Sequence, residues 1–387
     1  MGFAKAQPIL PCLMLARKQE LELNTVWNMS AQTRSPGPVR PSKETAMNRS
    51  IALGMIGTAG AFIVSLTLTL GAARAADDKI YVMKITLPTL NDPTHQFTKN
   101  YAAAIERDSG GRIKTEIYTA SQLGSIPRQI EGTQFGAIQC AVIPPEFFVG
   151  VDERFEVMAA PGLVNSMEHG QRLAADPAVM KLILGLGADK GLRGVGLMMA
   201  TPSSLIARTP IRRLADLKGK KIRVLASQFQ TVAFERLGAN PVALTLGDVL
   251  PAFQQGAIDG ALSALKNFVA MHFADTSKYV TEIGQPAIFA VVEISRKWYD
   301  SLPPDLQQIV DKDAAAESVA VNPQAIDIFN GARKDWVDNG GELISLPSDE
   351  QTSMLKTLAS VGEDVSKAKP QLSAAYQVVT AAAQRTR

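Results

Sequence analysis

The sequence has few of the residues on which catalytic and metal sites are usually built. Its 387 residues include three histidines and two cysteines. His95, His169 and His272 are widely separated, so their spacing gives no sign of a metal site. The motifs of serine hydrolases (GxSxG), P-loop proteins, HExxH metalloproteases and CxxC redox proteins are absent. The sequence therefore predicts no catalytic residues, no metal and no cofactor.

The N-terminal segment has the pattern of an export signal. Residues 51–71 carry no charge and no proline, follow a basic residue, and lead to Ala73-Arg74-Ala75, a small-x-small site of the kind that signal peptidase cleaves. We predict cleavage near Ala75 and a periplasmic location. Because the apolar run is long enough to span a bilayer, an uncleaved anchor is the alternative. Met47 is the predicted true start, and whether residues 1–46 are translated stays open.

The scarcity of cysteine limits what can stabilise the exported part. Cys12 lies in the leader, so Cys140 is alone in residues 76–387 and no disulfide can form within them. Cys140 lies in the apolar run 137–143, which predicts a packed strand residue rather than a reactive thiol. An exported domain without a disulfide depends on its hydrophobic core, and a chain of this length can bury a large one.

The net charge changes sign when the leader is left out. The whole chain has 40 basic and 37 acidic residues, a formal net charge of +3. Residues 1–75 hold eight of the basic and three of the acidic residues, so 32 basic and 34 acidic residues remain, a net charge of −2. The basic balance belongs to the leader, and charge predicts neither nucleic acid nor an anionic membrane as a partner.

Two stretches of the remaining sequence alternate between strand and helix patterns. Residues 79–145 indicate strand, helix, strand, helix, strand, and residues 221–265 repeat that order. Each βαβαβ unit implies parallel strands with right-handed crossovers. Short sequence also recurs, since QFGAI at 134–138 is answered by QQGAI at 254–258. We predict an α/β protein with two similar lobes and a ligand cleft at the carboxyl ends of their strands.

The rest of the chain is predicted to be mostly helical. A helical pattern starts at Pro303-Pro304 and continues to about Val337, interrupted at Pro323. At ~1.5 Å per residue this stretch could reach roughly 50 Å, enough to brace both lobes. The predicted division is a leader at 1–75, lobe I at 79–200 plus 289–328, and lobe II at 201–288 plus 329–387.

One charged residue is distinguished by its position. In KIRVL, residues 221–225, strand alternation places Ile222 and Val224 on one face and Arg223 on the other, near the carboxyl end of the strand. A guanidinium group there matches a carboxylate with two hydrogen bonds. The spacing alone leaves two interpretations open, a structural salt bridge at the sheet edge or a residue that binds a carboxylate ligand.

Six segments, in order, resemble one protein family. They are GGRI (110–113), QLGS (122–125), LADLKGKKIRV (214–224), LGANP (237–241), QQGAIDG (254–260) and WYDSLP (298–303). Over residues 79 to 380 the chain resembles the extracytoplasmic receptors of tripartite ATP-independent periplasmic (TRAP) transporters, of the dicarboxylate-receptor type. The resemblance implies a two-lobed periplasmic binding protein fold with a long bridging helix, closure on the ligand, and integral membrane subunits of a TRAP transporter as partners.

The resemblance also implies that Arg223 pairs with a substrate carboxylate. Other pocket positions depart from the family, since Leu262 and Ser263 stand where Glu and Asn are common. Phe147 and Phe289 fall where some relatives carry polar contacts. These departures favour a small monocarboxylate with an apolar or aromatic tail. The residues predicted to contact the ligand are Arg223, Ser263, Phe147, Phe289, Leu262, Pro144, Pro88 and Phe229.

Other functions stay open at this stage. A ligand-sensing receptor for a signalling partner would share these sequence features. A hydrolase or lyase acting on an organic acid is less expected, because no catalytic constellation is present. The sequence does not identify the ligand. The oligomeric state also stays open, since some relatives form homodimers through their C-terminal helices.

Overall fold

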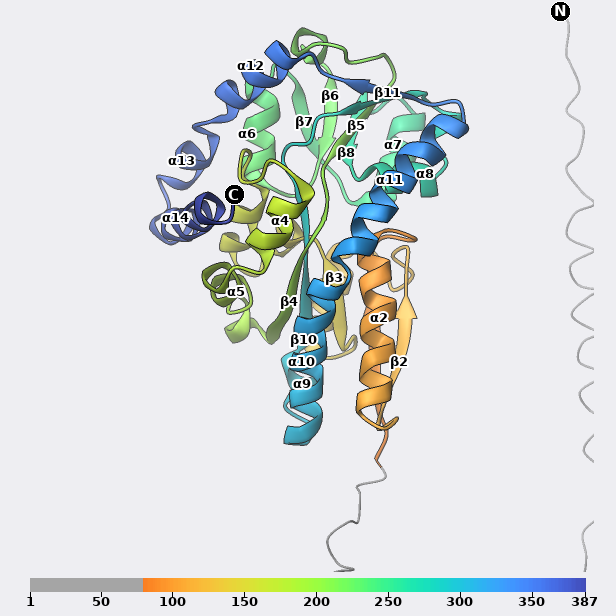
Figure 1. Ribbon diagram of the computed structural model, residues 1–387, viewed down its shortest axis with the longest axis vertical. Coiled ribbons are helices and arrows are strands. Elements are labelled where there is room, and N and C mark those ends of the chain that lie inside the picture. The colour runs from red at the N-terminus through yellow and green to blue at the C-terminus, as the bar shows by residue number, and fades with distance from the viewer. Residues whose placement is uncertain (1–78) are drawn as a thin grey trace, which may run out of the picture. The chain divides into compact units, whose positions relative to one another are not determined.

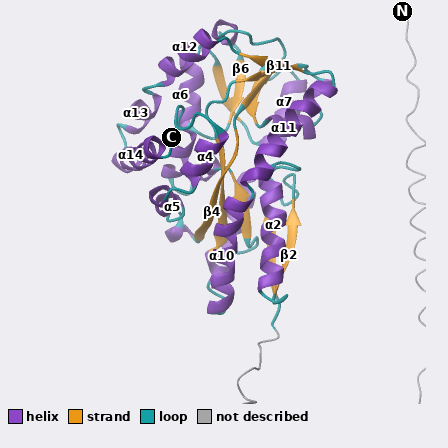
Figure 2. Cartoon of the chain, viewed as in Figure 1, coloured by secondary structure: helices purple, strands orange, loops and turns teal. Residues whose placement is uncertain are grey.

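A computed structural model describes residues 79–387, shown in colour in Figures 1 and 2. The predicted leader, Cys12 and the cleavage site near Ala75 lie outside the described residues. Among residues 79–387, no helix combines the length and apolar character needed to cross a membrane.

The first βαβαβ pattern builds one half of a five-stranded sheet. The strand order is β2-β1-β3-β10-β4. The central strand of the unit, β1, pairs in parallel with both β2 and β3, as the sequence pattern predicts. β10 arrives from much later in the chain and pairs antiparallel with β3 and β4. The bounds are β1 Tyr81–Thr86, α2 Pro93–Asp108, β2 Ile113–Tyr118, α3 Ile126–Phe135, β3 Cys140–Ile143, β4 Leu192–Thr201 and β10 Ile288–Ser295.

The second βαβαβ pattern builds part of a six-stranded sheet. The strand order is β11-β9-β5-β8-β6-β7, with β6 parallel to both β7 and β8. β5 pairs antiparallel with β8 and β9. The two sheets confirm the α/β class. The bounds are β5 Ser204–Ala207, β6 Lys221–Val224, α6 Gln228–Arg236, β7 Asn240–Ala243, α7 Leu246–Gln254, β8 Gly260–Ser263, α8 Leu265–Ala270, β9 Tyr279–Glu282 and β11 Glu342–Ser345.

The chain passes between the sheets through two short segments and a pair of helices. Residues 202–203 join β4 to β5, and residues 283–287 join β9 to β10. Helices α10 (Pro304–Ala320) and α11 (Asn322–Asp338) follow each other with a break beside Pro323, as predicted. α10 packs against α2 and β4, whereas α11 also packs against α8 and β11 (Figure 1). The helix pair therefore contacts elements of both sheets.

The last helix returns to the first half of the chain. α14 (Pro370–Arg385) packs against α4 (Met167–Ala174) and α5 (Pro177–Ile183) (Figure 1). A hydrogen bond of 2.8 Å joins His169 Nε2 to the Ala383 carbonyl. The predicted lobe II includes residues 329–387, of which α14 contacts the first half of the chain; the lobe boundaries stay a prediction. The remaining elements are η1 Pro145–Phe148, η2 Glu153–Ala159, η3 Ala188–Lys190, η4 Leu214–Leu217, η5 Phe273–Asp275, α9 Arg296–Tyr299, α12 Ser348–Leu358 and α13 Val361–Ser366.

The core needs no disulfide within the described residues. Cys140 lies on β3 with its side chain fully buried. It packs among the apolar residues that fill the space between the five-stranded sheet, α2 and α10. Burial raises the pKa of the Cys140 thiol far above its ordinary value. The thiol is therefore a packed strand residue, as the apolar run around it predicts, and has no thiolate to react.

Candidate functional site

The strand β6 carries a buried arginine near its carboxyl end. Arg223 is 2% exposed, while Ile222 and Val224 pack into a core cluster on the other face. Its Nε donates to the Leu244 carbonyl at 2.9 Å and its Nη1 donates to the Leu262 carbonyl at 2.7 Å. Both acceptors are neutral and both come from neighbouring strands or their ends. They fix the orientation of the guanidinium group without neutralising it.

The charge of Arg223 is not paired within the described residues. No carboxylate of residues 79–387 lies within ion-pairing distance, and its Nη2 donates to none of their atoms. The structural salt bridge that the sequence left open is therefore not formed. Burial lowers the pKa of Arg223 to about 10, and the charge of Glu146 acts in the opposite direction. The group remains a cation at neutral pH.

Arg223 lines a small cavity to which both sheets contribute. Its volume is about 40 Å³, room for a few water molecules. Ser263 at the end of β8 and Asn267 on α8 supply polar groups, linked by a hydrogen bond of 3.1 Å from Asn267 Nδ2 to Ser263 Oγ. The other lining residues are Pro88, Thr89, Asp92, Thr94, Ile126, Val142, Pro144, Phe147, Ala200, Thr201, Leu225, Leu246, Ala264, Ile288 and Phe289.

Six of the eight residues predicted to contact a ligand line this cavity, and two do not. Leu262 and Ser263 alternate on β8, so Ser263 faces the cavity while the Leu262 side chain packs in the core behind the sheet. Leu262 takes part only through the carbonyl that accepts from Arg223. Contact with a ligand stays a prediction for all of them. The residues that line the cavity are Pro88, Pro144, Phe147, Arg223, Ser263 and Phe289.

Phe229 is the second residue that the structure places elsewhere. It is fully buried on α6, in the core cluster that contains residues of α4, α5 and α14. Its ring centroid lies 6.0 Å from that of Tyr376 on α14. Its partner is therefore a helix more than 140 residues later, which local sequence does not reveal.

Several polar residues of the cavity were missed by the sequence analysis. Asp92 caps α2, since its Oδ1 accepts from His95 N at 2.9 Å. It also lines the cavity, where burial raises its pKa. Asn267 lies on α8, four residues after Ser263 at the end of β8, and the sequence carries no motif that marks it.

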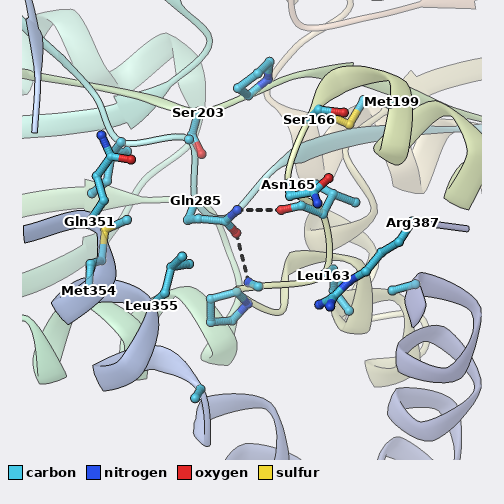
Figure 3. A pocket seen from close by; sticks show the side chains of 18 of the residues that line it. Leu163, Asn165, Ser166, Met199, Ser203, Gln285, Gln351, Met354, Leu355 and Arg387 are labelled. Carbon is cyan, nitrogen blue, oxygen red and sulfur yellow. Dashed lines mark hydrogen bonds between the residues drawn. The ribbon is translucent and has the colours of Figure 1, made fainter. Parts of the chain in front are cut away.

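A second, larger cavity is lined by residues of α12, of α14 and of the two segments that join the sheets, 202–203 and 283–287 (Figure 3). Its volume is about 600 Å³. Gln285 projects into it, donating from Nε2 to the Val164 carbonyl at 2.7 Å and accepting at Oε1 from Gly162 N at 2.9 Å. Its charged lining residues are Glu282 and Arg387, and Glu282 pairs with Arg333 at 2.7 Å. Judged by size alone, this larger cavity would be the better candidate for a ligand site. The buried, unpaired cation Arg223, however, lines the smaller cavity.

The described residues offer no obvious metal site. Among residues 79–387, no group of three or more His, Cys, Asp or Glu side chains is arranged to hold a metal ion. What the small cavity combines is one cation, a few polar side chains, the Asp92 carboxyl group, which caps α2 and whose pKa is raised by burial, and aromatic or proline walls. That combination is suited to binding a small anion with an organic body.

Comparisons with known proteins agree with this description. Residues 86–368 match the family described as bacterial extracellular solute-binding protein, family 7. The C4-dicarboxylate-binding periplasmic protein DctP of Rhodobacter capsulatus is 24% identical over 312 residues, which cover 80% of this chain and 93% of DctP. The uncharacterised protein YiiZ of Salmonella typhimurium is 28% identical over 208 residues, 54% of this chain, and the matched part spans 64% of YiiZ.

Solved structures share the fold at low sequence identity. A TRAP periplasmic solute-binding protein from Desulfovibrio salexigens, with bound orotic acid, has a TM-score of 0.75 and 22% identity. The alignment covers 79% of this chain and all of that structure. The two-lobed fold implied by the six sequence segments is therefore confirmed.

Proposed function

This chain belongs to family 7 of the bacterial extracellular solute-binding proteins, and on that premise we propose that it captures a small organic acid and delivers it to a TRAP-type transporter. One observation carries the choice of ligand class: Arg223 is a buried cation, held by two neutral carbonyls and facing a cavity. Two relatives support it, since one is named for C4-dicarboxylates and one holds orotic acid. Both of those compounds are organic acids.

The proposed role of Arg223 is to pair with the ligand carboxylate. A guanidinium group presents a planar fork of donors, and its Nη2 is free to donate. The Leu244 and Leu262 carbonyls hold the group in place before the ligand arrives, so little side-chain entropy is lost on binding. In a cavity from which water is excluded, the attraction between the two charges is stronger than in solvent.

The size of the cavity implies movement during binding. Pockets that hold small organic ligands usually measure roughly 300–1,000 Å³, and this one measures about 40 Å³. A ligand can enter only if the walls from the two sheets separate. Residues 202–203, residues 283–287 and the junction of α10 with α11 are the connections between the halves, so we place the hinge there.

The cavity walls suggest which acids bind best. Phe147, Phe289 and Pro144 favour an apolar or aromatic tail, while Ser263 and Asn267 offer hydrogen bonds near the carboxylate end. We therefore keep the prediction of a small monocarboxylate with such a tail. Strong binding of succinate or malate together with weak binding of all apolar acids would contradict it.

The location and the partners follow from the same premise. We propose that the protein works in the periplasm, with the leader removed near Ala75, and that it hands its ligand to integral membrane subunits. A sensory role would require the same capture step. Whether a small and a large membrane subunit bind the loaded protein distinguishes transport from sensing, and pull-down of either subunit by the ligand-saturated protein would be the measurement.

Thermal unfolding against a panel of ligands tests the proposal. The panel contains phenylacetate, orotate, succinate, L-malate and D-galacturonate, with glucose and alanine amide as compounds without a carboxylate. A ligand at 100 times its dissociation constant stabilises the folded state by about 2.7 kcal/mol. We expect only carboxylates to raise the Tm. If neutral compounds raise it and carboxylates do not, Arg223 has a structural role and the ligand class is wrong.

A further inference from the structure

A buried glutamate close to the proposed carboxylate site has no part in the proposed ligand binding. Glu146 belongs to η1, the short turn after β3, between Pro144 and Phe147, which both line the cavity. It is fully buried. Its Oε2 has no hydrogen-bond partner among the described residues, and its Oε1 accepts a long bond of 3.4 Å from Gln230 Nε2. The backbone N–H of Glu146 itself also favours the ionised carboxylate. A carboxylate buried with so few donors is costly to ionise.

Gln230 connects this carboxyl group to the strand of Arg223. Gln230 lies on α6, in the half of the chain that carries β6, and is fully buried. Its Oε1 accepts from Leu225 N at 2.8 Å. Leu225 follows Arg223 by two residues and lines the same cavity. Glu146 from the first half is therefore linked through Gln230 to the strand end that follows Arg223 in the second half, and each charge acts on the other.

We propose that Glu146 competes with the ligand for the charge of Arg223, so that the ligand carboxylate binds when Glu146 holds a proton and capture is accompanied by proton uptake. The inference rests on the proposed function, since it requires a carboxylate on Arg223. Its physical reason is charge balance. One guanidinium cation can offset one carboxylate in a buried site, and a second ionised carboxylate there would be left without a counter-charge.

Burial and the charged groups around Glu146 determine the pH range in which this residue gains or loses its proton. Burial raises the pKa of Glu146 to about 7, against the opposing attraction of Arg223, and the nearby Glu156 carboxylate on η2 adds to the rise. The charged residues of α3, which packs against η1, are exposed and pair with each other. On β10, the other element packed there, the ionisable residue is Glu293, whose charge acts on Cys140 rather than on Glu146. Proton exchange therefore occurs near neutral pH.

The sign of the pH dependence follows from these charges. A ligand carboxylate on Arg223 removes the attraction that favours ionised Glu146 and adds a like charge nearby, so the pKa of Glu146 rises on binding. The complex then holds more protons than the free protein. Affinity is highest below about pH 7 and falls as the pH rises above it, by up to roughly tenfold per pH unit.

Isothermal titration calorimetry of the purified protein tests this inference. The titrant is phenylacetate, orotate or succinate, whichever raises the Tm most, and all three are ionised between about pH 6.5 and pH 9. In the wild type we expect the Kd to rise roughly tenfold per pH unit above about pH 7. The binding heat should differ between phosphate and Tris buffers, because up to one proton is taken up.

Glu146→Gln is the decisive variant. It keeps the shape of the side chain without the titrating group, so its Kd should stay near the low-pH wild-type value at every pH and its heat should not depend on the buffer. Glu156→Gln is the matched control, since this carboxylate is bound by Gln228 N at 2.7 Å rather than competing for Arg223. It should keep the pH slope.

Three results separate the possible failures. A wild-type Kd that is flat with pH and a heat that does not depend on the buffer would overturn the inference even if Glu146→Gln does not fold. A slope that persists in a folded Glu146→Gln variant would overturn it as well. If no carboxylate of the panel binds at any pH, the proposed function fails and the inference fails with it.

Discussion

Each of the two sheets contains a buried ionisable side chain, and the surroundings of these two side chains differ. Arg223 in the six-stranded sheet donates to two carbonyls and faces a cavity. Glu293 on β10 of the five-stranded sheet is fully buried, both its carboxylate oxygens lack partners among the described residues, and it lines neither of the cavities described above. Burial alone raises the pKa of Glu293 well above its ordinary value, which favours the protonated form of this carboxyl group.

The comparison shows when a buried charge indicates a binding site. Burial is common to both residues and therefore does not distinguish them. What distinguishes Arg223 is that its surroundings hold it in one orientation, keep it charged, and leave one edge open to a cavity that a counter-ion can fill. Glu293 has none of these properties, and we assign it no part in ligand binding.

Removing Arg223 should have the largest effect. Arg223→Ala should weaken carboxylate binding by roughly 2–5 kcal/mol, because truncating one partner of a buried charge pair leaves the other without compensation. Arg223→Lys should recover part of the loss, since it restores the charge but not the planar fork. Calorimetric Kd values measure both effects.

The matched control for this prediction is an arginine of the other sheet. Arg193 on β4 pairs with Asp311 at 2.7 Å and is partly exposed. Arg193→Ala should leave the Kd unchanged within about twofold. If Arg223→Ala weakens carboxylate affinity by less than tenfold, or if both variants lose affinity equally, Arg223 is not the residue that binds the carboxylate.

Replacing Glu293 should have an intermediate effect, on stability rather than on binding. A buried polar group without a partner costs about 1–3 kcal/mol, and leucine has a similar volume. Glu293→Leu should therefore raise the free energy of unfolding by about that amount, measured by chemical denaturation, with the Kd unchanged. A destabilised variant would mean that Glu293 has a partner, such as buried water.

The pH dependence of stability tests the same residue independently. The pKa of Glu293 is raised in the folded state, so its contribution is most favourable below its unfolded value of about 4.5 and declines as the pH rises toward the folded value. The wild type should therefore lose more stability between about pH 5 and pH 8 than Glu293→Gln does. Equal losses in the two proteins would show that Glu293 is ionised when folded.

The features of the site that depend on local sequence were predictable. Strand alternation placed Arg223 opposite Ile222 and Val224, and the structure agrees. The same rule shows that Leu262 and Ser263, as neighbours on β8, could not both face the cavity. The Leu262 side chain therefore packs behind the sheet, and contact of Leu262 with a ligand stays a prediction.

The rest depends on contacts between distant segments. Phe229 on α6 packs against Tyr376 on α14, and no local pattern predicts that these two distant helices come together. No local sequence pattern singles out Glu146. Its burial follows only from the packing of η1 against η2, α3 and β10 and from its approach to Gln230 across the two halves.

Only a small effect on binding is expected at the larger cavity. Gln285→Ala removes the two hydrogen bonds that tie the segment between β9 and β10 to residues 162–164. The free energy of unfolding should fall by about 1–3 kcal/mol, at 0.5–1.5 kcal/mol per bond. The Kd for carboxylates should change by less than about twofold, because the larger cavity contains no unpaired buried charge. A tenfold change in calorimetric Kd would show that these hydrogen bonds bias the opening of the two halves. The larger cavity would then be energetically coupled to Arg223 and could no longer be treated as separate from the site.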